Sequence, residues 1–66
     1  MNIEQPKHMT DDDLQRLIKL HGKPKIDIWS NGTATIHFVG ADNDLIVNQN
    51  DQCWRAVVRM GVSHVV

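Results

Sequence analysis

Cysteine is almost absent from the sequence, because Cys53 is the only one in 66 residues. A disulfide within the chain is therefore excluded, and a single cysteine without a signal peptide suits a reducing cytoplasm. No apolar run approaches the length that crosses a membrane. A core of this size rarely supplies more than about 3–5 kcal/mol without a disulfide, a metal or a second chain. We therefore expect one cytoplasmic domain, without membrane contact, that gains stability as a homodimer.

Motifs that would indicate a reaction or a cofactor are also missing. The four histidines and Cys53 show no spacing of the C-x-x-C or H-x-x-x-H kind, which would place two metal ligands on one face. The four glycines fall at turn or cap positions and form no phosphate-binding loop. Nothing in the spacing brings Cys53 together with a histidine as nucleophile and base. We expect no metal, no cofactor and no enzymatic activity.

Basic residues are missing from the middle of the chain. No lysine or arginine occurs between Ile26 and Trp54, although four aspartates do. Five basic residues precede the first expected strand and two follow the last strand of the expected meander. They are Lys7, Arg16, Lys19, Lys23 and Lys25 on one side, and Arg55 and Arg59 on the other. With a net charge of −1, the chain shows no clear preference for a polyanion.

The clearest element is a helix between Thr10 and Gly22. Thr10 is a good N-cap, and the three aspartates that follow it suit the first turn of a helix. Apolar residues recur at helical spacing and form one face, while Gly22 and Pro24 end the helix. The aspartates could also bind a metal or a basic partner, but helix initiation explains them better. Residues 1–9 are polar and lack periodicity, so we predict a flexible tail over 1–9 and a single domain over 10–66.

The segment KIDIWSNGTATIHFVG, which begins at Lys25, indicates two strands joined near Asn31-Gly32. A two-residue turn would pair Ser30 with Thr33 and leave neither face apolar. A three-residue loop with Gly32 in the left-handed position pairs Trp29 with Thr33 and gathers the aliphatic side chains on one face. Because a slip of one residue flips every side chain, the hydrophobic pattern favours the longer loop. Trp29 then points away from the first helix.

A third strand follows a tight turn at Asp42-Asn43, which we expect to pair Gly40 with Leu45. Leu45 and Val47 then join the core face, which the first helix covers. The segment NDQCWRAVVRMG fits either a helix or a strand, and its end signals, Asn50 or Asp51 and Gly61, favour a helix. The β-branched ending VSHVV adds a short edge strand or an extended tail. The predicted fold is a small two-layer α+β domain of order α-β-β-β-α, with a three-stranded antiparallel meander.

The face of the sheet opposite the first helix carries the functional hypothesis. If the second helix covers this face, it is part of a second core; if not, it is a contact surface for a second copy or another protein. Aromatic side chains such as Trp29 often anchor such interfaces, and the aspartates favour a basic partner. The predicted partner-binding residues are Asp27, Trp29, His37, Val39, Asp42, Asp44 and Ile46.

Two functions follow from these patterns. The first is a non-enzymatic regulatory protein of the accessory or inhibitor type, such as those encoded by phages and mobile elements, that acts by binding another protein. The alternative is a DNA-binding transcriptional regulator that uses basic helix faces. Its candidate residues are Arg16, Lys19, Lys23, Arg55 and Arg59. Affinity for nucleic acid comes mostly from lysine and arginine, so the lack of basic residues in the predicted sheet argues against this alternative.

Overall fold

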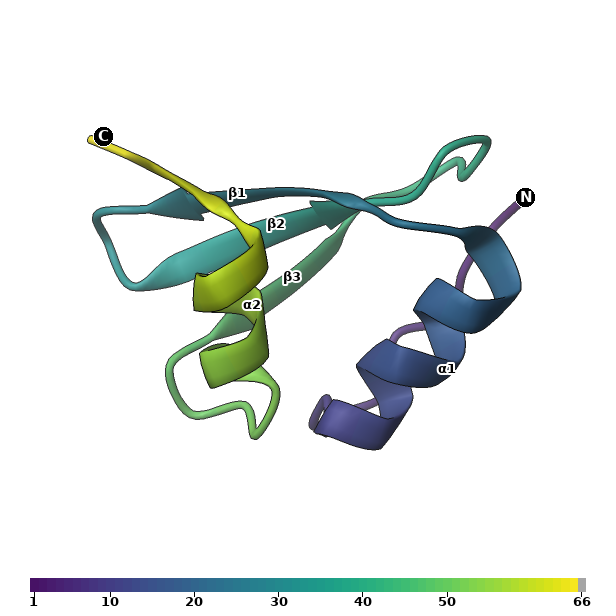
Figure 1. Cartoon of the computed structure of the whole chain (residues 1–66), viewed down its shortest axis with the longest axis horizontal. Coiled ribbons are helices and arrows are strands. Elements are labelled where there is room, and N and C mark those ends of the chain that lie inside the picture. The colour runs from purple at the N-terminus through teal and green to yellow at the C-terminus, as the bar shows by residue number, and fades with distance from the viewer. Residues whose placement is uncertain (66) are drawn as a thin grey trace.

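Four strands form one mixed sheet, and two helices lie on the same side of it (Figure 1). The computed structural model describes residues 1–65. The elements are, in chain order, α1 (Asp11–His21), β1 (Lys25–Trp29), β2 (Thr33–His37), β3 (Leu45–Asn48), α2 (Trp54–Met60) and β4 (Val62–His64). The strand order is β3-β2-β1-β4, in which β3, β2 and β1 form the antiparallel meander and β4 pairs in parallel with β1. The predicted α+β class, element order and final edge strand are confirmed.

The start of α1 is fixed by a capping box. The Thr10 hydroxyl accepts a hydrogen bond from the Asp13 backbone N–H, and the Asp13 carboxylate accepts one from the Thr10 N–H. These two bonds satisfy backbone donors that a helix leaves free at its N-terminus. The same carboxylate also pairs with Arg16 at 2.6 Å. Thr10 is thus the predicted N-cap, and Asp13 serves helix initiation.

The turn between β1 and β2 has the predicted longer loop. Ile28 lies opposite Ala34 and Ile26 opposite Ile36, a register that continues to Trp29 and Thr33. Gly32 has a φ of +87°, which residues with a side chain rarely adopt, and its N–H donates to the Trp29 carbonyl. The aliphatic side chains of both strands therefore share one buried face.

The predicted register between β2 and β3 is wrong by four residues. Leu45 lies opposite Ile36 and not opposite Gly40. The connection is therefore not a tight turn at Asp42-Asn43 but a longer loop over 38–44, in which Phe38 is buried and its carbonyl accepts from the Ala41 N–H. Because the shift is an even number of residues, Leu45 and Val47 still point into the core.

The second helix begins later than its sequence signals indicate. Its N-cap is Cys53, which makes no side-chain capping bond, and so neither Asn50 nor Asp51 caps it. The Asp51 carboxylate instead accepts from the backbone N–H groups of Met9 and Asn48, and it thus ties the β3–α2 loop to the start of the chain. The predicted end at Gly61 is confirmed, since its N–H donates to the Val57 carbonyl.

Residues 1–9 contribute to the packed domain, which corrects the predicted boundary at residue 10. Ile3 and Met9 are buried members of the core. The Asn43 side chain bonds both the N–H and the carbonyl of Ile3, and the Gln5 amide bonds both backbone groups of Ile46 at the outer edge of β3. These two apolar residues lie six apart in an otherwise largely polar segment, and two residues are too few to show a periodic pattern.

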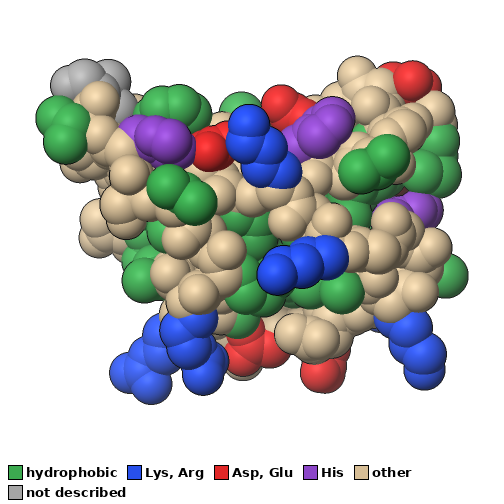
Figure 2. Space-filling view, turned by 45° about the horizontal axis from the view of Figure 1, so that its top comes forward, with side chains coloured by type: hydrophobic (Ala, Val, Ile, Leu, Met, Phe, Trp, Pro, Cys, Tyr) green, Lys and Arg blue, Asp and Glu red, His purple; other side chains and the backbone are tan. Residues whose placement is uncertain are grey.

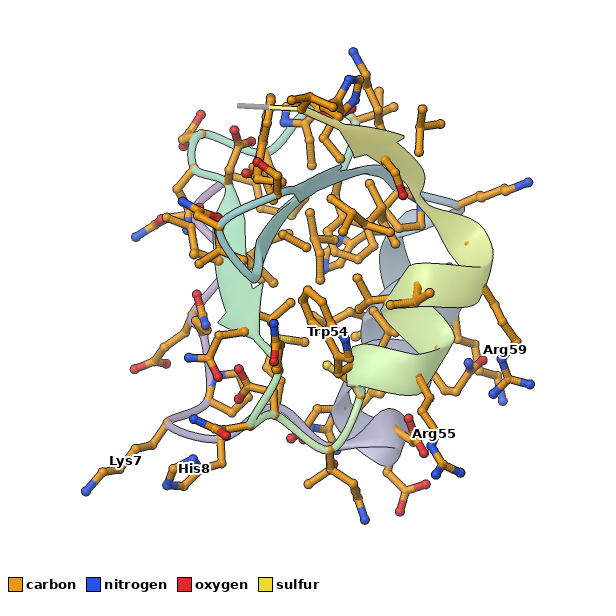
Figure 3. The ribbon with its side chains drawn as sticks, turned by 90° about the vertical axis from the view of Figure 1, so that its left-hand side faces the viewer. Lys7, His8, Trp54, Arg55 and Arg59 are labelled. Atoms are coloured by element: carbon orange, nitrogen blue, oxygen red, sulfur yellow. The ribbon has the colours of Figure 1, made fainter. Side chains whose placement is uncertain are left out.

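A single core lies between the sheet and the two helices. Leu14 from α1 and Val57 from α2 are fully buried in the same cluster as Ile26, Ile36 and Leu45 from the strands. Both helices therefore cover one face of the sheet, and the views along two directions agree on this arrangement (Figures 1 and 3). The possibility that α2 covers the opposite face is wrong, and among residues 1–65 no helix lies over that face.

Candidate functional site

The uncovered side of the sheet, which we call the open face, is the candidate functional site. Its residues alternate with the buried ones along β1, β2 and β3, and in β4 they are those that lie opposite open-face residues of β1. They are Lys25, Asp27 and Trp29 from β1, Thr33, Thr35 and His37 from β2, Ile46 and Asn48 from β3, and Val62 and His64 from β4.

Trp29 is held in a fixed position on this face. Its indole Nε1–H donates to the Thr35 hydroxyl at 2.9 Å. On its other side the indole stacks on the His64 ring, with ring centroids 4.9 Å apart. His64 is in turn fixed by a 2.7 Å hydrogen bond from Nε2 to the Asp27 carboxylate. Contacts from β2 and β4 thus hold an aromatic side chain that remains partly exposed.

A second histidine–carboxylate pair lies toward the other end of the face. His37 at the end of β2 bonds Asp44, which directly precedes β3, with 2.6 Å between Nδ1 and Oδ1. In Figure 2, histidine side chains lie beside acidic ones along the upper rim of the molecule. Both pairs are partly exposed, so solvent screens them and their contribution to stability is small.

The apolar residues of the open face are largely unprotected. The side chains of Ile46 and Val62 are 61% and 62% exposed, and they flank the central β1–β2 pair on opposite sides. Val39, at 78% exposed, does not belong to β2 as predicted but lies in the loop that follows it. The structure thus brings Trp29 and Ile46 onto one face, together with Asp27 and His37.

The charges of the open face differ from the sequence-based prediction. Lys25 is the first residue of β1 and lies on this face, opposite His37, so the sheet is not free of basic residues. The three aspartates predicted to attract a basic partner already have partners, since Asp27 and Asp44 bond histidines and Asp42 pairs with the N-terminal amine at 2.8 Å. Asp42 also lies outside the sheet, in the 38–44 loop. The open face is therefore mixed in charge.

The basic residues of the alternative hypothesis are dispersed. Arg16 is paired with Asp13 at 2.6 Å, and Lys19 and Lys23 are exposed at the other end of α1 and just beyond it. Arg55 and Arg59 lie together on α2 and line one hollow with Trp54 and Val58. Figure 2 shows the lysine and arginine side chains of that view in separate groups, without a continuous stripe.

The sequence did not predict that Val62 and His64 would lie on the open face. The ending VSHVV showed strand-like alternation, but the sequence did not indicate that it would pair in parallel with β1 and place His64 beside Trp29. That pairing depends on the position at which α2 returns the chain to the sheet. Only the alternation itself pointed to these residues.

The thiol of Cys53, the remaining candidate for reactive chemistry, lies in the core. Cys53 is completely buried, and burial followed by the nearby negative charge of Asp51 raises the pKa of its thiol to about 11. Such a thiol carries almost no thiolate at neutral pH and is a poor nucleophile. Among residues 1–65, no three histidine, cysteine or acidic side chains gather as a metal site would require.

Comparisons with protein-family models, curated proteins and solved structures give no match to this chain. Neither helix in the described residues has the length and apolar character needed to cross a bilayer.

Proposed function

We propose that this chain is a non-enzymatic protein-binding module that acts through its open face. In this proposal the protein works in the cytoplasm as a regulatory factor of the accessory or inhibitor type, and it blocks or shapes a surface on its target by occupying it. The observation that carries the proposal is that both helices cover the same side of the sheet, which leaves the partly exposed Trp29 and the exposed Ile46 without a helix over them.

The arrangement of Trp29 suits an interface anchor. A side chain that is already immobilised loses little conformational entropy when a partner covers it, so more of the contact energy remains as affinity. Trp29 is held in this way by Thr35 and His64. Exposed aliphatic residues beside it supply apolar area, and the paired histidines and carboxylates around them form a polar surround that is typical of protein interfaces.

Nucleic acid is a poorer match to this face. Phosphate contacts need several lysine or arginine side chains, and among the open-face residues only Lys25 is of that kind. Because Asp27 and Asp44 already have partners within the chain, we propose a target of mixed charge for the open face rather than a strongly basic one. A second copy of the chain is the first target to test, since so small a core benefits from association.

The test compares Ile46→Lys with Leu20→Lys. Both residues are exposed aliphatic side chains, at 61% and 69%, but Leu20 lies on α1, away from the open face. Each change adds one positive charge, so only the location differs. We expect Ile46→Lys to weaken self-association about tenfold in sedimentation equilibrium, as loss of an apolar interface contact does, and Leu20→Lys to leave it unchanged.

A photo-crosslinking amino acid at position 46, and in a second variant at position 20, tests for a different protein target in cells that carry the gene. Crosslinks to a defined protein from position 46 but not from position 20 would support the proposal. A protein that stays monomeric at all concentrations and forms no specific crosslink from position 46 would contradict it.

A further inference from the structure

The second helix presents a separate surface on the other side of the molecule. Trp54, Arg55, Val58 and Arg59 line a hollow of about 450 Å³ along α2. In Figure 3, Arg55 and Arg59 extend outward from α2, and Trp54 lies on the side of the helix toward the sheet. Trp54 packs in part against the core, whereas Val58 is 47% exposed.

The two arginines lack a carboxylate partner in the described part of the chain. Within residues 1–65, neither guanidinium forms an ion pair with a carboxylate, although Arg16 on α1 does. Arg59 donates only to the Arg55 carbonyl, at 3.5 Å. Like charges at positions i and i+4 of a helix repel one another, so this pair costs stability in the free protein. An anion placed between them would remove that repulsion.

The surroundings of the hollow limit the kind of anion that it can accept. At the N-terminal end of α2 the Asp51 carboxylate bonds the Met9 N–H, and Gln52 bonds the N–H of Asp11 at the acidic start of α1. A long phosphate backbone that follows α2 would meet these carboxylates. Lys7 and His8 lie on the N-terminal segment, on the opposite side of the view from Arg55 and Arg59, and so do not extend the positive surface (Figure 3).

We propose that this hollow binds a short acidic and apolar segment of a partner protein. The Cβ atoms of Arg55 and Arg59 are about 5–6 Å apart, as for any i, i+4 pair. Alternate residues of an extended peptide are about 7 Å apart and point the same way. Two carboxylates at alternate positions therefore match the two arginines. Val58 and the exposed part of Trp54, which lie beside the arginines in the same hollow, offer apolar contact to an aliphatic side chain of the segment. This site is independent of the open face.

The test is an NMR titration of the full chain with acetyl-Leu-Ser-Glu-Ser-Glu-amide. Two control peptides replace both glutamates by lysine or the leucine by glycine. We expect amide shifts centred on Trp54, Arg55, Val58 and Arg59, with weaker binding at high salt and no binding of the lysine peptide. Exposed ion pairs contribute little each, so we expect the double variant Arg55→Gln, Arg59→Gln to bind about fivefold more weakly.

The matched control is Lys19→Gln, Lys23→Gln, which also removes two exposed positive charges and gives the same net charge. It should change affinity by less than about twofold, since unpaired surface charges away from the site act only through a screened field. Tighter binding of single-stranded oligothymidylate than of the acidic peptide would overturn the proposal in favour of nucleic acid. Concentration-dependent shifts at these four residues without peptide would overturn it in favour of a second copy, and an absence of shifts at millimolar peptide would refute the site itself.

Discussion

Cys53 shows how one buried side chain makes stability depend on pH. Its thiol is neutral in the fold, and burial together with the Asp51 charge raises its pKa from an ordinary value of 9.0 to about 11. In the unfolded chain the thiol loses its proton near the ordinary value. Between these two pH values the unfolded state therefore binds fewer protons than the folded state, and the free energy of unfolding falls as pH rises.

We therefore predict a stability loss that is specific to this thiol. The free energy of unfolding should fall by up to about 1.4 kcal/mol per pH unit between pH 9.0 and about 11 through this group. Urea unfolding of the natural chain and of Cys53→Ala at several alkaline pH values measures the effect. All other residues are the same in both proteins, so the difference between the two curves isolates the thiol. Parallel curves would show that Cys53 is not the cause.

At the scale of elements, the end of α2 lies very close to β1. A Cβ atom on Gly61 would lie 2.8 Å from Ile26 Cγ2 and 2.8 Å from Ile28 Cδ1, which are both core side chains. The backbone of Gly61 has an ordinary extended conformation. The glycine is therefore needed for space, because α2 could not otherwise end so close to the sheet and pass the chain to β4.

Gly61→Ala should destabilise the protein by about 1–3 kcal/mol through overpacking. Adding Ile28→Val removes the Cδ1 atom, so the double variant should lose less stability than the sum of the two single changes. Gly22→Ala is the comparison, because Gly22 has a φ of +88° and no atom within 4 Å of its added Cβ. Its cost, about 1 kcal/mol of backbone strain, should be independent of Ile28→Val. Strict additivity of Gly61→Ala and Ile28→Val would contradict this account.

The two hairpin registers show what alternation can and cannot determine. Between β1 and β2 the competing registers differed by one residue and would have moved Trp29 to the other face, so the pattern decided correctly. Between β2 and β3 the predicted register was wrong by four residues. A shift by an even number leaves each side chain on the same face, so the alternation of apolar and polar residues cannot detect it. The loop over 38–44 is set instead by long-range bonds, such as that between Asn43 and Ile3.

The residues of the candidate site were predictable only where strand alternation determines which face they occupy. Alternation placed Trp29, Asp27, His37 and Ile46 on one face, as observed. It could not predict the stacking of His64 on Trp29, because parallel pairing of β4 depends on the path of the whole chain. Which face α2 would cover was also open, since a helix with apolar residues on one side fits either face of a sheet.

At the scale of the whole molecule, the two edge strands of the sheet, β3 and β4, differ in whether their outer side is covered. At the outer side of β3, the Gln5 side-chain amide donates to the Ile46 carbonyl at 2.6 Å and accepts from the Ile46 N–H at 3.1 Å. In the described residues no strand pairs with the outer side of β4, where Val62 is exposed. A side-chain amide that occupies these backbone groups opposes edge-to-edge pairing there, so the N-terminal segment protects this edge as well as contributing to the core.

The contribution of that segment to stability can be measured at Ile3, which is buried beside the 38–44 loop. Truncating a buried aliphatic side chain removes apolar contact and leaves a cavity, so Ile3→Ala should lower the free energy of unfolding by about 2 kcal/mol or more. Val65→Ala is the control, because Val65 lies near the other end of the chain and is 94% exposed. It should change stability by less than about 0.5 kcal/mol. Equal, negligible effects of the two changes in urea unfolding would mean that residues 1–9 are a flexible tail after all, and that the core closes without them.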